Sequence, residues 1–319
     1  MLMIVLLISY LTSLILFPVM IARLKNSGIV GKNMNSAMQE DIAEMGGIVV
    51  VAGFGAGIFT VISAKTFFNL FLEIDLVSLS TALSAILIVV LIGIIDDLIS
   101  ISQKVKAFLP AIAALPLIVI QEGNSIVNLP FLGYRDFGLF YTLLVIPTEI
   151  TIAANAVNML AGFNGIEVGM GIVAISTLAV IAFLLGKMTV VVILLATVGA
   201  LLAALYFNWF PAKVLMGDVG TYSIGAIIAV AIIMGNFEIA GMILLIPYII
   251  DFLIKAKNRF PYSFGNFRKG KLYCPDNGPV GLGQLIMKMC GGISERNLVL
   301  FMMGIETAFG VIAILVYMQ

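Results

Sequence analysis

Three carboxylates and an amide stand out because they lie at the ends of apolar runs, where an unsatisfied polar group costs several kcal/mol. Asp96 and Asp97 end one run, Asn158 ends another, and Asp218 follows Gly217 just before a third. The sequence contains no histidine, which removes the commonest general base and transition-metal ligand. Acid–base or metal chemistry must therefore use carboxylates, amides and a hard cation, and Asp218 with an amide such as Asn158 would suit one.

A second concentration of polar residues runs from 155 to 167, where three carboxamides and a carboxylate follow an apolar run. Reading back from it, Thr148, Thr151, Asn155 and Asn158 are spaced so that they share one helix face. Such a face is expected to meet protein or a water-filled cavity and not lipid.

Asn164-Gly165 follows that helix and is typical of a tight turn. A carboxamide presents both a donor and an acceptor, as an imide-edged base such as uracil requires. The spacing by itself does not separate a base contact from an ordinary turn.

The Asp96-Asp97 pair is followed by Lys104 and Lys106. Adjacent residues on a helix diverge by about 100°, so one carboxylate can hold structure while the other reacts. The two lysines suit phosphate binding as well as ordinary membrane topology. Further carboxylates within apolar runs, Glu149, Asp251 and Glu306, are either interhelical partners or part of a cavity.

Composition places the whole chain in a membrane. Of 319 residues, 62% are hydrophobic and 11% charged, far from the roughly 25% charged residues of a soluble domain. The net charge of zero gives no indication of a nucleic-acid partner. Cys274 and Cys290 lack the spacing of a zinc site or a disulfide framework.

Apolar stretches predict an all-α integral membrane protein with one polytopic domain over 1–319 and about ten transmembrane helices. The expected spans are 1–22, 45–64, 76–95, 105–121, 137–158, 166–186, 188–207, 220–236, 238–256 and 297–318.

The basic residues orient this arrangement. Of the 17 Lys and Arg residues, all but Lys65, Arg135 and Lys187 fall in one set of loops, which the positive-inside rule makes cytoplasmic. Both termini then lie on the outer face of the cell membrane, and every polar motif comes to the cytoplasmic face. The loop from 257 to 296, with a short helix expected at Gly283–Cys290, would form a small cap over a cytoplasmic active site.

Taken together, the motifs resemble those of the polyprenyl-phosphate N-acetylhexosamine-1-phosphate transferases. The residues that carry the resemblance are Asp96-Asp97, Asn155-x-x-Asn158-x-Leu-Ala-Gly-x-Asn164-Gly-x-Glu167 and Asn208-Trp-Phe-Pro-x-Lys-x-x-x-Gly217-Asp218. Gly292-Ile-Ser-Glu-Arg-Asn-Leu298 resembles the C-terminal segment of the dolichol branch, the UDP-GlcNAc:dolichyl-phosphate GlcNAc-1-phosphotransferases. The compact last loop and the missing histidine favour an archaeal member.

The resemblance implies transfer of GlcNAc-1-phosphate from UDP-GlcNAc to dolichyl or another polyprenyl phosphate, with release of UMP, as the first step of lipid-linked oligosaccharide assembly for N-glycosylation. It implies Mg²⁺, or alternatively Mn²⁺, and leaves a homodimer open. The implied roles are as follows: Asp218 and Asn158 bind metal, Asp96 or Asp97 lies near the lipid phosphate, Lys106 binds phosphate, Asn164 binds uracil, Asn155 and Glu167 belong to the substrate site, and Arg259 binds the diphosphate or sugar.

Two alternatives remain at this point. A related transferase could use another UDP-N-acetylhexosamine or undecaprenyl phosphate. A secondary transporter would also have many spans and intramembrane carboxylates, but the halves show no internal repeat and the polar motifs gather at one face.

Overall fold

The computed structural model describes residues 1–35, 40–129 and 133–318, and these are mostly helical. The long helices are α1 (Leu2–Asn26), α2 (Gly47–Phe68), α3 (Leu76–Ile99), α6 (Ile146–Leu160), α7 (Ile166–Leu184), α8 (Met188–Asn208), α9 (Gly217–Gly235) and α13 (Glu295–Tyr317). Shorter helices are α4 (Gln103–Phe108), α5 (Leu115–Val119), α10 (Glu238–Leu244), α11 (Ile246–Lys257) and α12 (Leu282–Met289).

The membrane-spanning helices are fewer than the sequence predicts. Among the described residues, eight helices are long and apolar enough to cross a membrane, and nine if the bent pair α10–α11, which turns by 53°, is one span. The predicted ten are therefore not confirmed. The expected span 105–121 is divided into α4, the 3₁₀-helix η1 (Leu109–Ala114) and α5. Pro110 and Pro116 lie at the starts of the last two pieces, because proline cannot donate the hydrogen bond that continues a helix.

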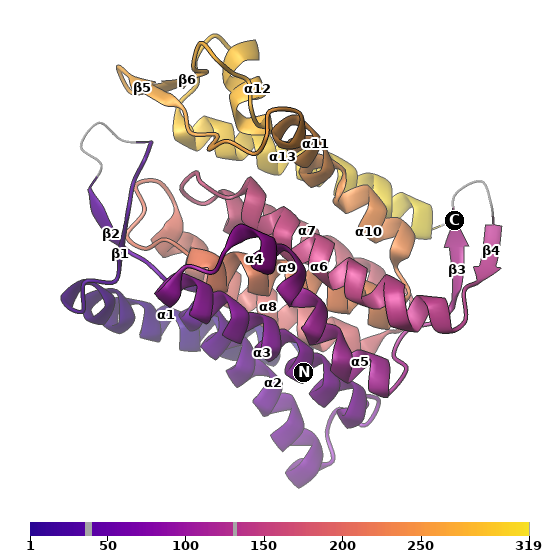
Figure 1. The fold of residues 1–319 in the computed structure, drawn as a ribbon. Helices are drawn as coiled ribbons and strands as arrows, with labels where there is room; N and C mark the ends of the chain where they lie inside the picture. The colour runs from indigo at the N-terminus through magenta and orange to yellow at the C-terminus, as the bar shows by residue number, and fades with distance from the viewer. Residues whose placement is uncertain (36–39, 130–132, 319) are drawn as a thin grey trace.

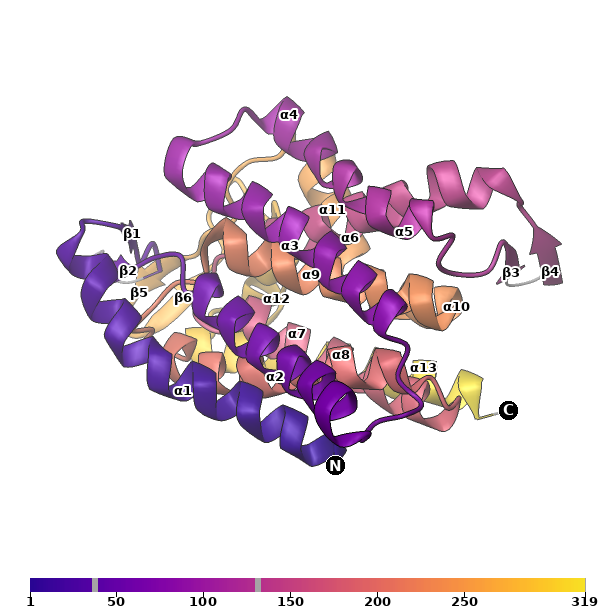
Figure 2. The ribbon, with the colours of Figure 1, turned by 90° about the horizontal axis from the view of Figure 1, so that it is seen from below.

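Helix α9 lies at the centre of the bundle, and every residue from Val219 to Gly235 is buried. It packs against α2, α3, α6, α7 and α8 (Figures 1 and 2). Glycines permit the closest approaches: a Cβ at Gly93 of α3 would lie 2.6 Å from the Val219 Cα, and one at Gly47 of α2 would lie 2.2 Å from the Gly220 nitrogen. The start of α9, where Asp218 lies, is thus fixed by backbone contact with two neighbours.

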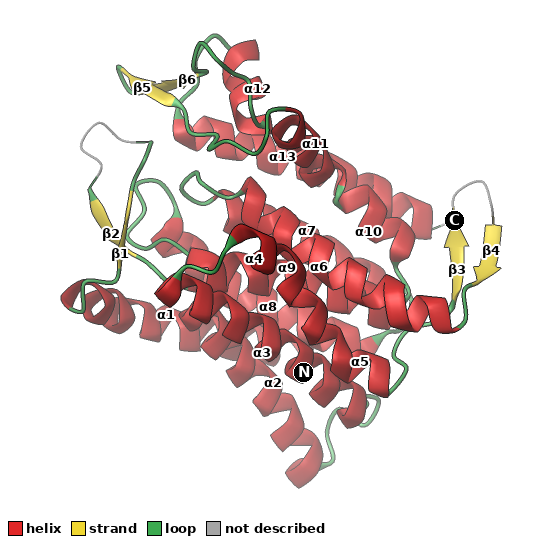
Figure 3. Cartoon of the chain, viewed as in Figure 1, coloured by secondary structure: helices red, strands yellow, loops and turns green. Residues whose placement is uncertain are grey.

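Three two-stranded antiparallel hairpins lie outside the helices (Figure 3). They are β1 (Val30–Lys32) with β2 (Asp41–Ala43), β3 (Ile126–Leu129) with β4 (Gly133–Asp136), and β5 (Asn266–Arg268) with β6 (Lys271–Tyr273). Strand β2 also holds the segment before α9, because the Leu215 N–H donates to the Ala43 carbonyl at 2.8 Å and the Gly46 N–H donates to the Leu215 carbonyl at 2.9 Å.

The C-terminal elements α10 to α13 form a layer beside the remaining helices (Figure 1). Within it, α12 closely matches the short helix predicted at Gly283–Cys290. Backbone hydrogen bonds of 2.7 and 3.0 Å between Leu272 and Ile293 join β6 to the start of α13. On the predicted polar face of α6, the side chains of Thr151, Asn155 and Asn158 are half-buried and bonded to protein, as expected, whereas Thr148 is exposed.

Candidate active site

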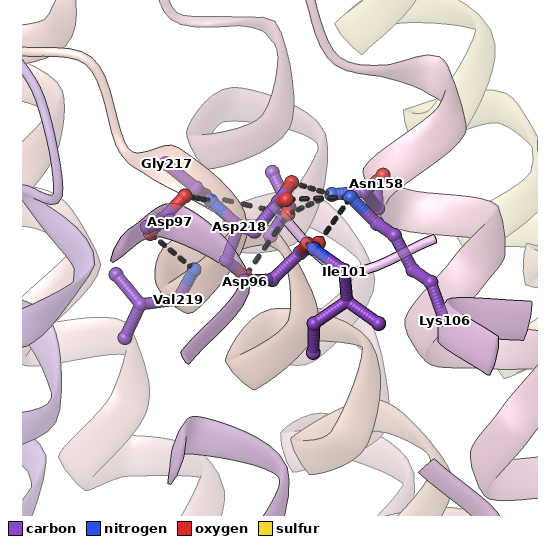
Figure 4. Close-up of polar contacts among 9 residues, drawn as sticks. Asp96, Asp97, Ile101, Lys106, Asn158, Gly217, Asp218 and Val219 are labelled. Carbon is purple, nitrogen blue, oxygen red and sulfur yellow. Dashed lines mark hydrogen bonds and ion pairs between the residues drawn. The ribbon is translucent and has the colours of Figure 1, made fainter. Parts of the chain in front are cut away.

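Asp97 fixes the N-terminus of α9. Its Oδ1 accepts the Asp218 backbone N–H at 2.7 Å and its Oδ2 accepts that of Val219 at 3.0 Å (Figure 4). These N–H groups lack partners inside their own helix, and a carboxylate is the favoured group at a helix N-terminus. Gly217 is required beside this contact, since it has φ of +69° and a Cβ there would lie 2.6 Å from the Asp97 Oδ2.

Asp96 lies one residue earlier on α3 and has different partners, as the predicted divergence of the pair requires. Its Oδ1 accepts the Ile101 N–H at 2.7 Å, and its Oδ2 lies 2.5 Å from the Lys106 ammonium. The same ammonium lies 2.5 Å from the Asp218 Oδ2, so Lys106 bridges the two carboxylates (Figure 4). It also stands 5.5 Å from the centroid of the Tyr222 ring.

The charge of Lys106 is secured by this arrangement. Its ammonium lies 2.5 Å from a carboxylate oxygen of Asp96 and 2.5 Å from one of Asp218, and two acids favour the charged form of a lysine. Lys106 is therefore a cation held between two acids at the start of α9.

Asn158 comes to Asp218 from α6. Its Nδ2 donates to the Asp218 Oδ1 and, at 2.8 Å, to the Thr221 hydroxyl. In this orientation the amide is a donor, so metal ligation by its oxygen would require the carboxamide to turn over. The structure thus brings together five of the residues predicted from the sequence: Asp96, Asp97, Lys106, Asn158 and Asp218.

The donor set fits a hard cation that takes most of its ligands from substrate and water. Among the described residues, no three His, Cys, Asp or Glu side chains converge to hold an ion. Asp218 supplies carboxylate oxygens and Asn158 an amide oxygen, which are ligands that Mg²⁺ accepts. Mg²⁺ commonly completes such a shell with water and phosphate oxygens.

Asn155 lies one helical turn before Asn158, but its side chain binds backbone. Its Nδ2 donates to the Ala107 carbonyl at 3.1 Å and to the Thr151 carbonyl at 2.8 Å. Ala107 follows Lys106 in sequence, so in this structure Asn155 fixes the segment that presents the lysine.

Asn164 and Glu167 are both buried, and Asn164 belongs to a second polar group. The Asn164 N–H donates to Oε1 of Glu295, the first residue of α13, at 2.8 Å. The Asn35 amide donates to the Gly162 carbonyl at 2.6 Å and to the same Glu295 oxygen at 3.5 Å. The 161–165 loop is therefore tied both to the N-terminal hairpin region and to α13.

Arg259 is exposed at the end of α11, and its guanidinium has no hydrogen bond or ion pair with another described residue. Its backbone φ of +64° lies in the left-handed region. The structure does not bring it to the Asp218 group, and its implied role on the diphosphate or sugar stays a prediction.

Glu44 was missed by the sequence analysis. It follows β2 and lies near Asp218: burial raises the pKa of its carboxyl, and the negative charge of Asp218 raises it further. The signal that could have found it is an acid just before Gly46-Gly47 at the start of an apolar run, similar to the setting of Asp218.

Comparison with known proteins connects this geometry to a family. The model of glycosyl transferase family 4 matches residues 77–236, half of the chain, and this stretch includes Asp96, Lys106, Asn158 and Asp218. A protein of Saccharolobus solfataricus is 40% identical over 313 residues, which cover 97% of this chain and 94% of the relative. It is provisionally named a UDP-N-acetylglucosamine–dolichyl-phosphate N-acetylglucosaminephosphotransferase.

Two more distant relatives are also similar. A Dictyostelium discoideum protein that bears the same name without qualification is 26% identical over 272 residues, covering 72% of this chain and 66% of the relative. A Bacillus subtilis protein, provisionally named an undecaprenyl-phosphate N-acetylglucosaminyl 1-phosphate transferase, is 26% identical over 310 residues, covering 96% of this chain and 82% of the relative.

Proposed function

The chain belongs to glycosyl transferase family 4, and from this premise we propose that it transfers GlcNAc-1-phosphate from UDP-GlcNAc to dolichyl phosphate within the membrane. An oxygen of the lipid phosphate attacks the β-phosphorus of the donor and forms a new P–O bond. The bond from that phosphorus to the bridging oxygen breaks, and its electrons leave with UMP. The product is the lipid diphosphate that carries GlcNAc.

The observation that carries this proposal is the bridge of Lys106 between Asp96 and Asp218 at 2.5 Å each. Phosphoryl transfer asks chiefly for positioning and for stabilisation of charge on oxygen. A half-buried cation held by two helices supplies both, and a phosphate oxygen can compete for the ammonium. The lipid phosphate, with a second pKa of about 6, is mostly ionised at neutral pH, so none of these carboxylates has to act as a strong base.

In this proposal Asp218 and Asn158 hold Mg²⁺, or alternatively Mn²⁺, and Asp97 positions them by fixing the start of α9. When bound, the metal would neutralise charge on the donor diphosphate. Asn164 would contact the uracil of the donor, Glu167 would belong to the substrate site, and Arg259 would contact the diphosphate or sugar.

We also propose ten membrane crossings, with the residues 103–119 as a broken one. Lys106 lies at the N-terminal end of α9, bonded to Asp218, while Gly123 packs near the Ile233 carbonyl at the other end. The connecting segment therefore runs from one end of α9 to the other, packed against α3 and α6. Ten crossings would leave both termini on the outer side and the Asp218 group on the cytoplasmic side, where the basic residues gather.

The direct test is the product of the purified protein with UDP-GlcNAc, a polyprenyl phosphate and Mg²⁺. We expect UMP and a lipid-linked GlcNAc diphosphate in equal amounts. Release of UDP in place of UMP would mean that the sugar C–O bond is cleaved, which contradicts the proposed step. Comparison of dolichyl with undecaprenyl phosphate, and of UDP-GlcNAc with other UDP-N-acetylhexosamines, assigns the acceptor and donor.

Orientation is tested with the native cysteines, since Cys290 is exposed. A membrane-impermeant maleimide should label Cys290 in inverted vesicles and leave it unlabelled in right-side-out vesicles. Cys290→Ala serves as the control for specificity. Labelling from the outer side alone would reverse the proposed topology.

A further inference from the structure

A buried ion pair on α11 lies outside the site described above. Asp251 and Lys255 are one helical turn apart, with 2.8 Å between the Lys255 ammonium and the Asp251 Oδ2, and their side chains are only 5% and 8% exposed. Burying two charges costs several kcal/mol per ion unless further hydrogen bonds satisfy them. Both members of this pair have such contacts.

Each partner reaches a different helix. The Lys255 ammonium donates to the Met159 carbonyl near the C-terminal end of α6, and the Asp251 Oδ1 accepts the N–H of Leu282, the first residue of α12, at 2.7 Å. A cation at a helix C-terminus and an anion at a helix N-terminus both match the helix dipoles. The pair therefore joins α6, α11 and α12 at one buried point.

The contact on α6 falls beside the candidate site. Met159 directly follows Asn158, and α6 ends one residue later, before the loop that carries Asn164. The last carbonyls of a helix have no partner within it, so the end of a helix frays unless side chains bind them. Lys255 supplies that bond at the turn from which Asn158 projects.

We propose that Lys255 and Asp251 are positioning residues that fix the last turn of α6, and with it Asn158, relative to α12. The inference rests on the proposed function, because it gives Asn158 the role of a metal ligand. The pair makes the geometry of Asn158 depend on α12, so the position of α12 and the metal site are set together.

The test uses Asp251→Asn/Lys255→Met, which removes both charges and leaves neither partner as an unpaired buried ion. The asparagine oxygen can still accept the Leu282 N–H, so the double variant loses chiefly the bond to Met159. Lys255→Arg, which keeps a cation and its donors, is the conservative variant. Lys65→Met is the matched control, because the Lys65 ammonium also donates to backbone carbonyls, those of Leu72 and Ile74, away from the site.

The primary measurement is Mn²⁺ binding by electron paramagnetic resonance in the presence of UMP, whose phosphate oxygens can complete the metal shell, together with the melting temperature. Residues that orient metal ligands typically contribute about 10–100-fold to metal affinity. We expect a loss in this range for the double variant, wild-type affinity for Lys65→Met, and largely restored affinity for Lys255→Arg. With saturating metal, turnover of the double variant should recover. The apparent dissociation constant for Mn²⁺ should therefore change more than kcat.

The outcomes separate the inference from the function on which it rests. If the wild-type protein binds Mn²⁺ and Asp218→Ala does not, but the double variant binds as tightly as wild type, the positioning role is wrong and the metal site stands. If wild type itself binds no Mn²⁺ at the Asp218 group, the proposed metal site fails and this inference fails with it. A double variant that loses stability and turnover together, without a selective change in Mn²⁺ affinity, would show an ordinary structural role and overturn the inference.

Discussion

The Asp97 carboxylate holds the backbone N–H of Asp218 at 2.7 Å, so one acid of the site fixes the position of another. With both oxygens of Asp97 engaged by α9, its neighbour Asp96 is the member of the pair that contacts Lys106. The adjacent carboxylates therefore have separate tasks: Asp97 anchors the helix that carries Asp218, and Asp96 helps to hold the cation.

Replacement of Asp97 by Asn should weaken metal binding as well as turnover. An amide has one acceptor oxygen, so it can bind one of the two α9 N–H groups but not both. We expect Mn²⁺ affinity to fall about tenfold or more, as for other residues that orient ligands. Asp75→Asn is the matched control, since Asp75 caps the start of α3 by accepting the N–H groups of Val77 and Ser78. Unchanged metal affinity with reduced turnover would instead favour a direct role of Asp97 at the lipid phosphate.

Loss of either proposed metal ligand, Asp218 or Asn158, should lower turnover more than Asp97→Asn does. Asp218→Ala removes a carboxylate and also leaves Lys106 with one partner, whereas Asn158→Ala removes a neutral amide. We expect both to abolish most Mg²⁺-dependent UMP release, with Asp218→Ala the worse. Activity within about tenfold of wild type for a folded Asp218→Ala protein, at saturating Mg²⁺, would remove the metal assignment.

Lys106 should be required for turnover, in contrast to Lys104. Lys106→Gln removes the cation that bridges Asp96 and Asp218, and the loss of one preorganised group that stabilises charge typically costs about 10²–10³ in kcat. Lys104→Gln is the control, because Lys104 is exposed and lies on the same short helix. Steady-state UMP release by the two variants makes the comparison. Equal effects of the two changes would mean that positive charge in this loop matters and the bridge does not.

Glu44 gives a pH-dependent prediction. Burial and the charge of Asp218 raise the pKa of the Glu44 carboxyl in the folded protein above its value in the unfolded chain. The contribution of this carboxyl to folding stability is therefore fully present below the unfolded pKa, where the group is protonated, and is lost as pH rises through the folded pKa. Glu44→Gln should therefore raise the melting temperature at pH 7 to 8, by on the order of 1–3 °C, and leave it unchanged near pH 4. Glu73→Gln, at an exposed position, is the control. A shift of the same size at both pH values would rule out the charge as its cause.

Substitution of Arg259 tests its predicted contact with the diphosphate or sugar of the donor. Arg259→Lys keeps the charge but loses the forked donors, so catalytic efficiency should fall by about 1.5–3 kcal/mol if the guanidinium binds a diphosphate. Lys269→Ala and Lys271→Ala should have almost no effect on kcat/KM. If Arg268→Lys is impaired while Arg259→Lys is not, the basic residue that contacts the substrate lies at the β5–β6 hairpin.

The sequence was most informative where polar residues interrupt apolar runs. Asp96, Asp97, Lys106, Asn158 and Asp218 come from α3, α4, α6 and α9, and their gathering follows from the rule that intramembrane polar groups need protein partners. Hydropathy also located the long helices, because length and apolarity suffice for a span.

What the sequence could not supply was pairing between distant segments. Nothing in the composition of the Glu44 loop indicates that β2 would bind the segment before α9, since such contacts depend on backbone hydrogen bonds that any residue can make. The partners of Asp251 likewise cannot be predicted from the sequence, because a buried ion pair and a helix cap depend on how the helices pack. Hydropathy predicts one continuous span over 105–121, because it gives little weight to the helix-breaking Pro110 and Pro116.

Helix α9, buried from Val219 to Gly235, carries Asp218 on the element that is most enclosed by its neighbours. Changes in bilayer thickness or lateral pressure act first on helices with largely exposed surfaces, such as α1 and α13, and reach α9 through the surrounding protein. Asp218 is thereby the fixed point of the group, and the amide of Asn158 approaches it from α6, which is far less enclosed by protein.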